Sequence, residues 1–177
     1  MRFFNSMQKN MSFADVIASI KYFIRVNPDS KFRLAVGTDS QVKGKYTCFV
    51  TGIHMHRIGQ GAWCCITKMI EHKRYTSLKE KIEKETLLTY EIANMINEQL
   101  VETLYDFSAK YKNFDCKLEA HIDVGTKGET RNLVKEMTGY FESMDIDAKI
   151  KPDSFVASTY ANRYSKNISA AFDKKAI

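Results

Sequence analysis

Three strand-like segments in close succession restrict the fold of this chain more than any other feature. Residues 32–38, 46–56 and 62–70 are rich in β-branched and aromatic side chains, and only the short turns KGK and RIGQG separate them. Parallel strands need a crossover of a dozen or more residues, so strands joined by such turns pair antiparallel. The sequence therefore predicts a three-stranded antiparallel meander in the first half of the chain.

The second half of the chain alternates between helical and strand-like patterns. Ser77 opens SLKE, a capping-box sequence that predicts the start of a long helix reaching about residue 105. The segments that follow alternate in type: strand 116–124, helix 129–144, strand 147–151 and helix 154–165. Antiparallel strands followed by alternating units predict a mixed sheet with helices on its faces. The expected fold class is therefore α/β, with a mixed five-stranded sheet and flanking helices.

An additional helix is expected before the first strand. Ser12 and Asp15 form a capping box, and apolar residues then recur at helical spacing over 12–26, before NPDS ends the pattern. Because the 177 residues contain no linker and no repeat, residues 1–177 are predicted to form a single domain. The last residues, 167–177, are expected to form a flexible tail.

Composition argues against a membrane or secreted protein, and the net charge favours a polyanionic partner. No apolar run approaches the length of a membrane span, and the N-terminus lacks the apolar segment of a secretory signal. A cytoplasmic location without a membrane partner is therefore expected. The four cysteines form neither a disulfide framework nor a zinc ribbon. The net charge of +6 favours a polyanionic partner, and the oligomeric state stays open.

Glu85 interrupts the apolar face of the long helix. At ~100° per residue, several apolar residues lie within roughly 80° of it on the helical wheel: Leu88, Ile92, Met95, Ile96 and Leu100. Glu91, in contrast, lies about 120° away, at the polar edge. An acid in the middle of a core-facing stripe is unfavourable unless a partner stabilises its charge. The alternative interpretation is that Glu85 extends to solvent or pairs with a lysine.

Three aspartates accompany this glutamate. Asp39 and Asp123 each come at the end of a predicted strand, and Asp153 follows the last predicted strand. Carboxylates from strand ends and from a covering helix can converge at one edge of a sheet, where a divalent cation relieves their mutual repulsion. Oxygen-only ligands suit Mg²⁺ or Mn²⁺, and two such ions can activate water and stabilise the leaving oxygen of a phosphodiester. The sequence thus predicts a metal site that contains Asp39, Glu85, Asp123 and Asp153.

These motifs resemble those of a known family. Three antiparallel strands, a helix and then β-α-β-α is the element order of the ribonuclease H fold. More closely, VGTDSQV, GAWCCI, TSLKEKI, HIDVG and KPDSFVASTYANRY are similar to the YkuK-type ribonuclease-H-like family of bacterial proteins, from about residue 11 onward. The resemblance implies a metal-dependent nuclease acting on RNA, DNA or a hybrid. Asp39 and Asp123 would bridge the ions, and Glu85 and Asp153 would complete their ligand shells.

One position departs from the ribonuclease H pattern. Ribonucleases H usually place the last acid after an alanine in the final helix, and here Asn162 follows Ala161. An asparagine binds a metal ion more weakly than a carboxylate does. The departure keeps a second interpretation open, a nucleic-acid- or partner-binding protein with weak or no catalytic activity on the same scaffold. A purely structural role without divalent-ion binding is the third.

Basic residues around the predicted acidic edge are candidates for contacts with a nucleic-acid backbone. Lys127, Arg131 and Arg163 are the main candidates, and Lys149 and Lys151 belong to the same rim. For each of them, a solvated rim position without a ligand is the alternative.

The histidines allow two further interpretations. His54 and His56 lie two residues apart on one strand and so point to the same side, and with His121 and an acid they could hold zinc. His121, beside the acids, could instead orient a water or contact a phosphate; ordinary strand positions are the plain alternative. DVGTKGETR is also similar to the phosphate loop of actin-like ATPases, but those need two such domains to enclose ATP. Trp63 is expected in the core rather than as a stacking surface for bases.

Overall fold

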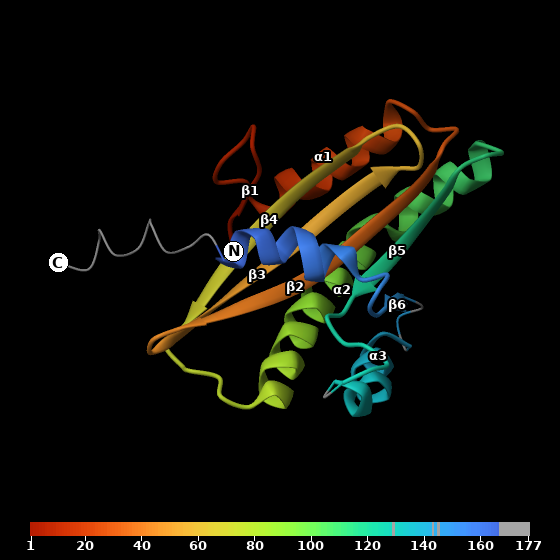
Figure 1. The fold of residues 1–177 in the computed structure, drawn as a ribbon. Coiled ribbons are helices and arrows are strands. Elements are labelled where there is room, and N and C mark those ends of the chain that lie inside the picture. Colours follow the sequence, from red (N-terminus) through yellow and green to blue (C-terminus); the bar gives the residue numbers. More distant parts are fainter. Residues whose placement is uncertain (129, 143, 145, 167–177) are drawn as a thin grey trace.

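A six-stranded mixed sheet forms the middle layer of the protein (Figure 1). The computed structural model describes residues 1–128, 130–142, 144 and 146–166. The strands are β1 (Phe3–Phe4), β2 (Lys31–Lys43), β3 (Tyr46–Arg57), β4 (Ala62–Glu71), β5 (Asp115–His121) and β6 (Asp147–Lys149). Their order across the sheet is β1-β4-β3-β2-β5-β6. Pairing is antiparallel from β1 to β2 and parallel from β2 to β6.

The expected α/β class, the antiparallel meander and the ribonuclease-H-like arrangement are confirmed, and all five expected strands are present. A sixth strand, β1, joins the edge of β4, where Phe3 pairs with Thr67 and forms a bridge to Met11. Two residues are too few to show a strand period, so the sequence pattern did not predict β1. β2 continues to Lys43, and Asp39 therefore lies inside this strand rather than at its end.

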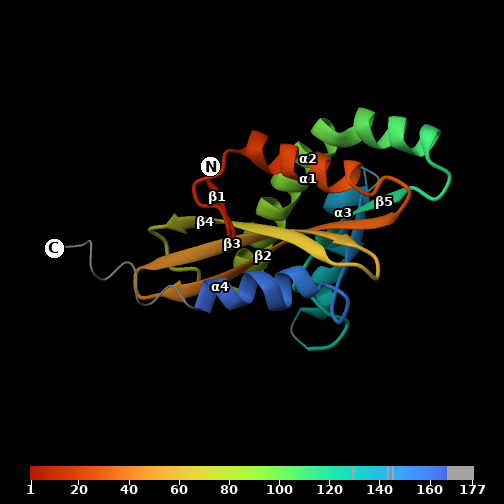
Figure 2. The ribbon, with the colours of Figure 1, turned by 90° about the horizontal axis from the view of Figure 1, so that it is seen from above.

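Two helices, α1 (Phe13–Arg25) and α2 (Leu78–Lys110), cover one face of the sheet (Figure 2). α1 begins with the expected capping box, in which Ser12 and Asp15 each accept a hydrogen bond from the other's backbone N–H. Ser77 caps α2, as expected, and α2 continues about one turn beyond the predicted end. Apolar side chains of both helices meet the sheet in one core: Ile20, Ile24, Phe32, Leu34, Val36, Ile92 and Ile96.

The C-terminal segment packs on the opposite face of the sheet (Figure 2). It consists of a π-helical turn, η2 (Val156–Ala161), which continues into α4 (Asn162–Lys166). Two glycines let it approach the strands directly. A Cβ atom on Gly37 would lie 2.7 Å from the backbone nitrogen of Ala157, and one on Gly52 would lie 2.8 Å from Cδ1 of Tyr160.

The remaining elements lie beyond β5. A 3₁₀ turn, η1 (Arg131–Leu133), leads into α3 (Val134–Glu142), where the sequence predicted one helix over 129–144. The predicted final helix, 154–165, begins at Val156. The tail predicted for 167–177 lies outside the described residues.

Candidate functional site

Three of the four predicted acids come together where β2 and β5 part. Gly37 of β2 pairs with His121 of β5 in the parallel ladder, so Asp39 and Asp123, each two residues further on, lie at the same end of these strands. Glu85 comes from the second turn of α2. The charges of Asp39 and Asp123 both raise the pKa of Glu85, so each of the two aspartates is close enough to act on this glutamate.

Glu85 is buried, and burial makes its ionised form unfavourable. Its side chain is only 5% exposed, and burial raises its pKa from 4.5 to about 7. Ser40 Oγ donates a 2.7 Å hydrogen bond to Glu85 Oε1, and Lys81 Nζ lies 3.6 Å from the same oxygen. Both contacts oppose the rise in pKa but are outweighed by burial. Glu91 is exposed, so Glu85 is the glutamate of this helix that faces the sheet.

Asp39 accepts a hydrogen bond from the final helix. The donor is Ser165 Oγ, which is fully buried and bonds to Asp39 Oδ2. Asn162, at the position where ribonucleases H usually have the last acid, donates to the carbonyl oxygen of Ser158 of its own helix at 3.1 Å. Sequence reasoning missed Ser165, and also Ser40, because it searched for acids. Helical spacing could have identified Ser165, since it lies three residues after Asn162 and therefore on the same side of the helix.

Asp123 lies just beyond the end of β5 and pairs with a lysine. Lys151 Nζ is 3.1 Å from Asp123 Oδ1. This oxygen is buried, and a buried charge needs a partner, which the ammonium group of Lys151 supplies.

Asp153, the fourth predicted acid, lies in the turn after β6. It is exposed, and it lines a hollow of about 360 Å³ together with Arg33, Glu119, Lys149 and Phe155, among others. That Asp153 is a ligand of the predicted metal site therefore stays a prediction.

His121 supports the C-terminal segment rather than facing the acids. The ring is 1% exposed; Nδ1 accepts the backbone N–H of Val156 at 3.1 Å, and Nε2 lies 3.1 Å from Glu119 Oε2. Glu119 in turn pairs with Arg33 at 3.2 Å. Burial lowers the pKa of His121, which favours the neutral ring that these two bonds require. Because both ring nitrogens are engaged, His121 has no nitrogen available for zinc.

The candidate backbone-binding residues are exposed at the rim. Lys127 lies in the loop after Asp123, Arg131 begins η1, and Arg163 lies on α4. In the loop that follows Asp123, the N–H of Gly125 donates to Thr130 Oγ1 at 3.1 Å and so is not directed to a phosphate. The loop therefore lends no support to the ATPase alternative.

The donor chemistry of the three carboxylates fits a divalent cation, but their present arrangement is not that of a formed metal site. Only oxygen donors are present, which suits Mg²⁺ or Mn²⁺. Among the described residues, no three His, Cys, Asp or Glu side chains are grouped so that they could hold an ion. Protein groups occupy the carboxylate oxygens instead: the hydroxyl groups of Ser40 and Ser165 and the ammonium groups of Lys81 and Lys151.

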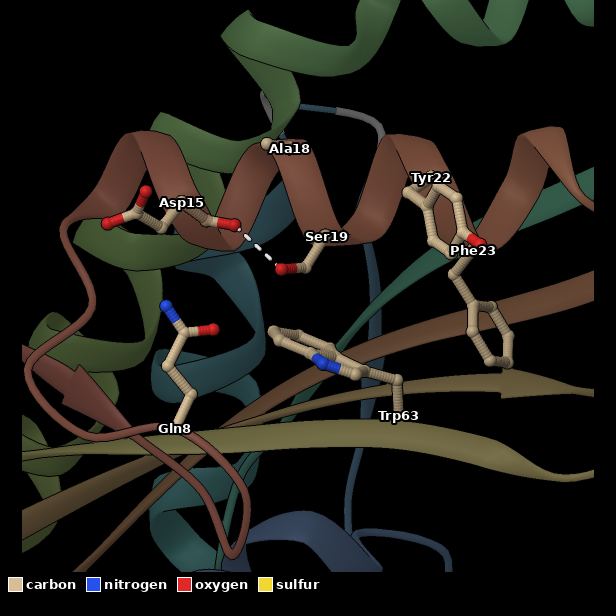
Figure 3. Close-up of a pocket in the computed structure, with 7 residues that line it drawn as sticks. All are labelled: Gln8, Asp15, Ala18, Ser19, Tyr22, Phe23 and Trp63. Atoms are coloured by element: carbon tan, nitrogen blue, oxygen red, sulfur yellow. Dashed lines mark hydrogen bonds between the residues drawn. The ribbon is translucent and has the colours of Figure 1, made fainter.

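A separate hollow of about 420 Å³ lies between α1, β4 and the N-terminal segment (Figure 3). Trp63 forms its floor, with Tyr22, Phe23 and Gln8 around it. Across the sheet, Asp39 of β2 pairs with Val50 of β3, and Val50 pairs with Lys68 of β4. Trp63 precedes Lys68 by five residues on β4, so it lies about 17 Å along the strand direction from the level of Asp39. Trp63 is half-buried at the edge of the core rather than inside it, and it does not belong to the carboxylate site.

No helix in the described parts of the chain is long and apolar enough to cross a membrane.

Comparison with known proteins gives two matches. The profile of the ribonuclease H-like family matches residues 15–166. An uncharacterized protein of Bacillus subtilis (strain 168), YkuK, is 42% identical over 166 residues, which cover 93% of this chain and 96% of the relative. No solved structure matches the chain. The matched region contains Asp39, Glu85, Asp123 and the final helix.

Proposed function

The chain belongs to the ribonuclease H-like family, as a YkuK-type member, and on this basis we propose that it is a divalent-metal-dependent nuclease. One observation carries the proposal: Glu85 is buried beside Asp39 and Asp123, and all three can offer oxygen atoms to a cation. The proposal extends to the predicted ion, Mg²⁺ or Mn²⁺, and to a nucleic-acid substrate.

The energetics of Glu85 support a functional role. A rise in pKa from 4.5 to about 7 means that the ionised side chain costs the folded protein about 3 kcal/mol. An apolar side chain or a glutamine at this position would avoid that cost. A divalent cation between the carboxylates would offset it, because the cation stabilises the ionised form of each of them.

Each residue has a defined part in this proposal. When bound, Mg²⁺ or Mn²⁺ would lower the pKa of water and offset the charge that develops on the leaving oxygen of a phosphodiester. Asp39, Glu85 and Asp123 would hold the ion, and Asp153 would join them only after a rearrangement of its loop. Ser40 and Ser165 would fix the orientation of the carboxylates through their hydroxyl groups. Lys127, Arg131 and Arg163 would bind the phosphate backbone.

A second function also has an observation in its favour. The described side chains are not grouped as a metal site, and the final helix presents a serine rather than a carboxylate to Asp39. A protein that binds nucleic acid or a protein partner, with weak or no catalytic turnover, would not need a complete metal site.

A cleavage assay separates the two functions. Labelled RNA–DNA hybrid, duplex, single-stranded and branched substrates are incubated with the purified protein and Mg²⁺ or Mn²⁺. The nuclease proposal expects cleavage that requires the ion and is lost in Asp39→Asn, Glu85→Gln and Asp123→Asn. Glu91→Gln, an exposed glutamate on the same helix, is the matched control and should retain activity. Cleavage that survives all three substitutions would come from a contaminating nuclease, and binding without any cleavage would favour the second function.

A further inference from the structure

We propose that Lys81 and Lys151 are resident cations of the carboxylate site, which release their carboxylates to an incoming divalent ion and then bind the phosphodiester. The inference rests on the proposed function and deepens it, because it assigns the residues that contact the scissile phosphate. Two ion pairs of similar form, on two separate elements, carry it.

Lys81 is the cation on the helical side. It lies one turn before Glu85 on α2, and its Nζ is 3.6 Å from Glu85 Oε1. The lysine is 28% exposed while the glutamate is 5% exposed, so the lysine is the partner in this pair that solvent reaches. An ion that binds Glu85 Oε1 must displace this ammonium group.

Lys151 is the cation on the strand side. It follows β6, and its Nζ is 3.1 Å from Asp123 Oδ1, a buried oxygen. The lysine is 48% exposed, and its flexible stem can swing away without disturbing the backbone. The contact is therefore a partly exposed ion pair that Lys151 can leave.

Space and charge both require the lysines to move when an ion binds. A divalent ion would take the carboxylate oxygens at about 2.1 Å, and ammonium groups facing the same oxygens would then repel it. With all three carboxylates ionised, as a bound cation favours, three carboxylates and two ammonium groups leave one net negative charge. Adding a divalent ion changes this to one net positive charge, which the single negative charge of a phosphodiester balances. The released ammonium groups would then contact this phosphodiester.

The chain offers a matched control for each lysine. Lys84 lies three residues after Lys81 on α2 and pairs with Glu71 at 3.0 Å. Lys149 lies two residues before Lys151 and pairs with Asp147 at 2.6 Å. Replacing any of these four lysines by glutamine removes one positive charge, but of the four only Lys81 and Lys151 pair with acids of the site.

The test measures two affinities in the same variants. Mn²⁺ affinity is measured by titration, and nucleic-acid affinity in Mn²⁺ is measured with a fluorescent phosphorothioate-linked RNA–DNA hybrid, which resists cleavage. Lys81→Gln and Lys151→Gln should bind Mn²⁺ roughly three- to tenfold more tightly, because removing a partly exposed ion-pair partner frees its carboxylate. The same variants should bind the hybrid more weakly.

Lys84→Gln and Lys149→Gln should keep the Mn²⁺ affinity of the wild type, and Lys151→Arg, which keeps the charge, should behave like the wild type.

The outcomes are separable. Unchanged or weaker Mn²⁺ binding in Lys81→Gln and Lys151→Gln, with a wild type that binds Mn²⁺, would overturn this inference and leave the proposed nuclease function intact. A wild type that binds no Mn²⁺ would overturn both. Circular dichroism melting of each variant shows whether it is folded, and Lys151→Gln tests the proposal independently if Lys81→Gln, on the more buried pair, fails to fold.

Discussion

At the scale of single residues, each carboxylate of the site has a different neighbour, and these neighbours were the hardest part to predict. Helical periodicity placed Glu85 toward the sheet correctly, because it depends only on spacing along one helix. It could not identify Ser40 or Ser165, because contacts across elements depend on how α2 and α4 are positioned on the strands. Asn162, at the position where ribonucleases H usually have the last acid, lies about one turn before Ser165 and bonds to Ser158 of its own helix.

Glu85→Gln should stabilise the protein at alkaline pH while removing metal binding. Burial raises the pKa of Glu85 to about 7 and so favours its protonated form in the folded protein. The stability that this protonated form contributes is fully present below pH 4.5 and is lost as the pH rises through 7. At pH 8 the substitution should raise the melting temperature by a few degrees, since it removes up to about 3 kcal/mol of unfavourable ionisation. At pH 5 the difference should be small. Thermal melts from pH 4 to pH 9 test this, with Glu91→Gln as control; a variant that is less stable than the wild type at pH 8 would contradict the account.

Ser165 gives a second test at this scale. Ser165→Ala should cost about 1–3 kcal/mol, because a buried hydrogen bond to a charged group is removed. Ser165→Asp should destabilise the metal-free protein more, since it places a carboxylate against Asp39, but should gain more in melting temperature when Mg²⁺ is added. Thermal melts at increasing Mg²⁺ concentration provide the measurement. If Mg²⁺ has no larger effect on Ser165→Asp than on the wild type, Ser165 does not face the ion.

At the scale of elements, the meander and the helix caps could be predicted because both are local. The turns between β2, β3 and β4 contain few residues, and the capping box of α1 lies within four consecutive residues. β1 and the π-helical start of the C-terminal segment could not be predicted in this way. β1 exists only because Phe3 pairs with Thr67, and η2 is held by long-range contacts with β2 and β3.

Gly37→Ala should release the C-terminal segment from the sheet. A Cβ at this position would lie within 3.0 Å of backbone atoms of Ala157 and His121, which cannot yield as a flexible side chain could. The expected loss is roughly 1–3 kcal/mol, with faster hydrogen exchange confined to residues 156–166. Gly139→Ala, in α3, is the matched control, because its Cβ would meet no atom within 4 Å; it should be neutral or stabilising by up to about 1 kcal/mol. Normal exchange of residues 156–166 in Gly37→Ala would show that the close packing is not needed.

At the scale of the whole molecule, element order predicted the fold class, and the family match over residues 15–166 agrees with it. Which acids lie close together was less predictable than the fold. Asp39 and Asp123 meet because β2 and β5 are parallel neighbours in register, whereas Asp153 lies in a separate hollow beside Arg33 and Glu119. Sequence order alone treats all three as residues near strand ends.

The net charge of +6 and the exposed rim residues predict salt-dependent binding of nucleic acid. Replacing Lys127, Arg131 and Arg163 together by glutamine should weaken binding to duplex substrates. It should also reduce the slope of log affinity against log salt by about 0.9 for each phosphate that the protein no longer neutralises. Fluorescence anisotropy between about 50 and 200 mM salt provides the measurement. An unchanged slope would mean that these residues form a solvated rim only.

The central claim is that Asp39, Glu85 and Asp123 form one divalent-ion site, and a crystal of the protein grown or soaked with Mn²⁺ tests it most directly. The account predicts an anomalous difference peak at the manganese absorption edge between these three carboxylates, with Lys81 and Lys151 turned away from Glu85 and Asp123. A well-ordered crystal with no peak there, or with its strongest peak beside Asp153 and Glu119, would contradict the claim.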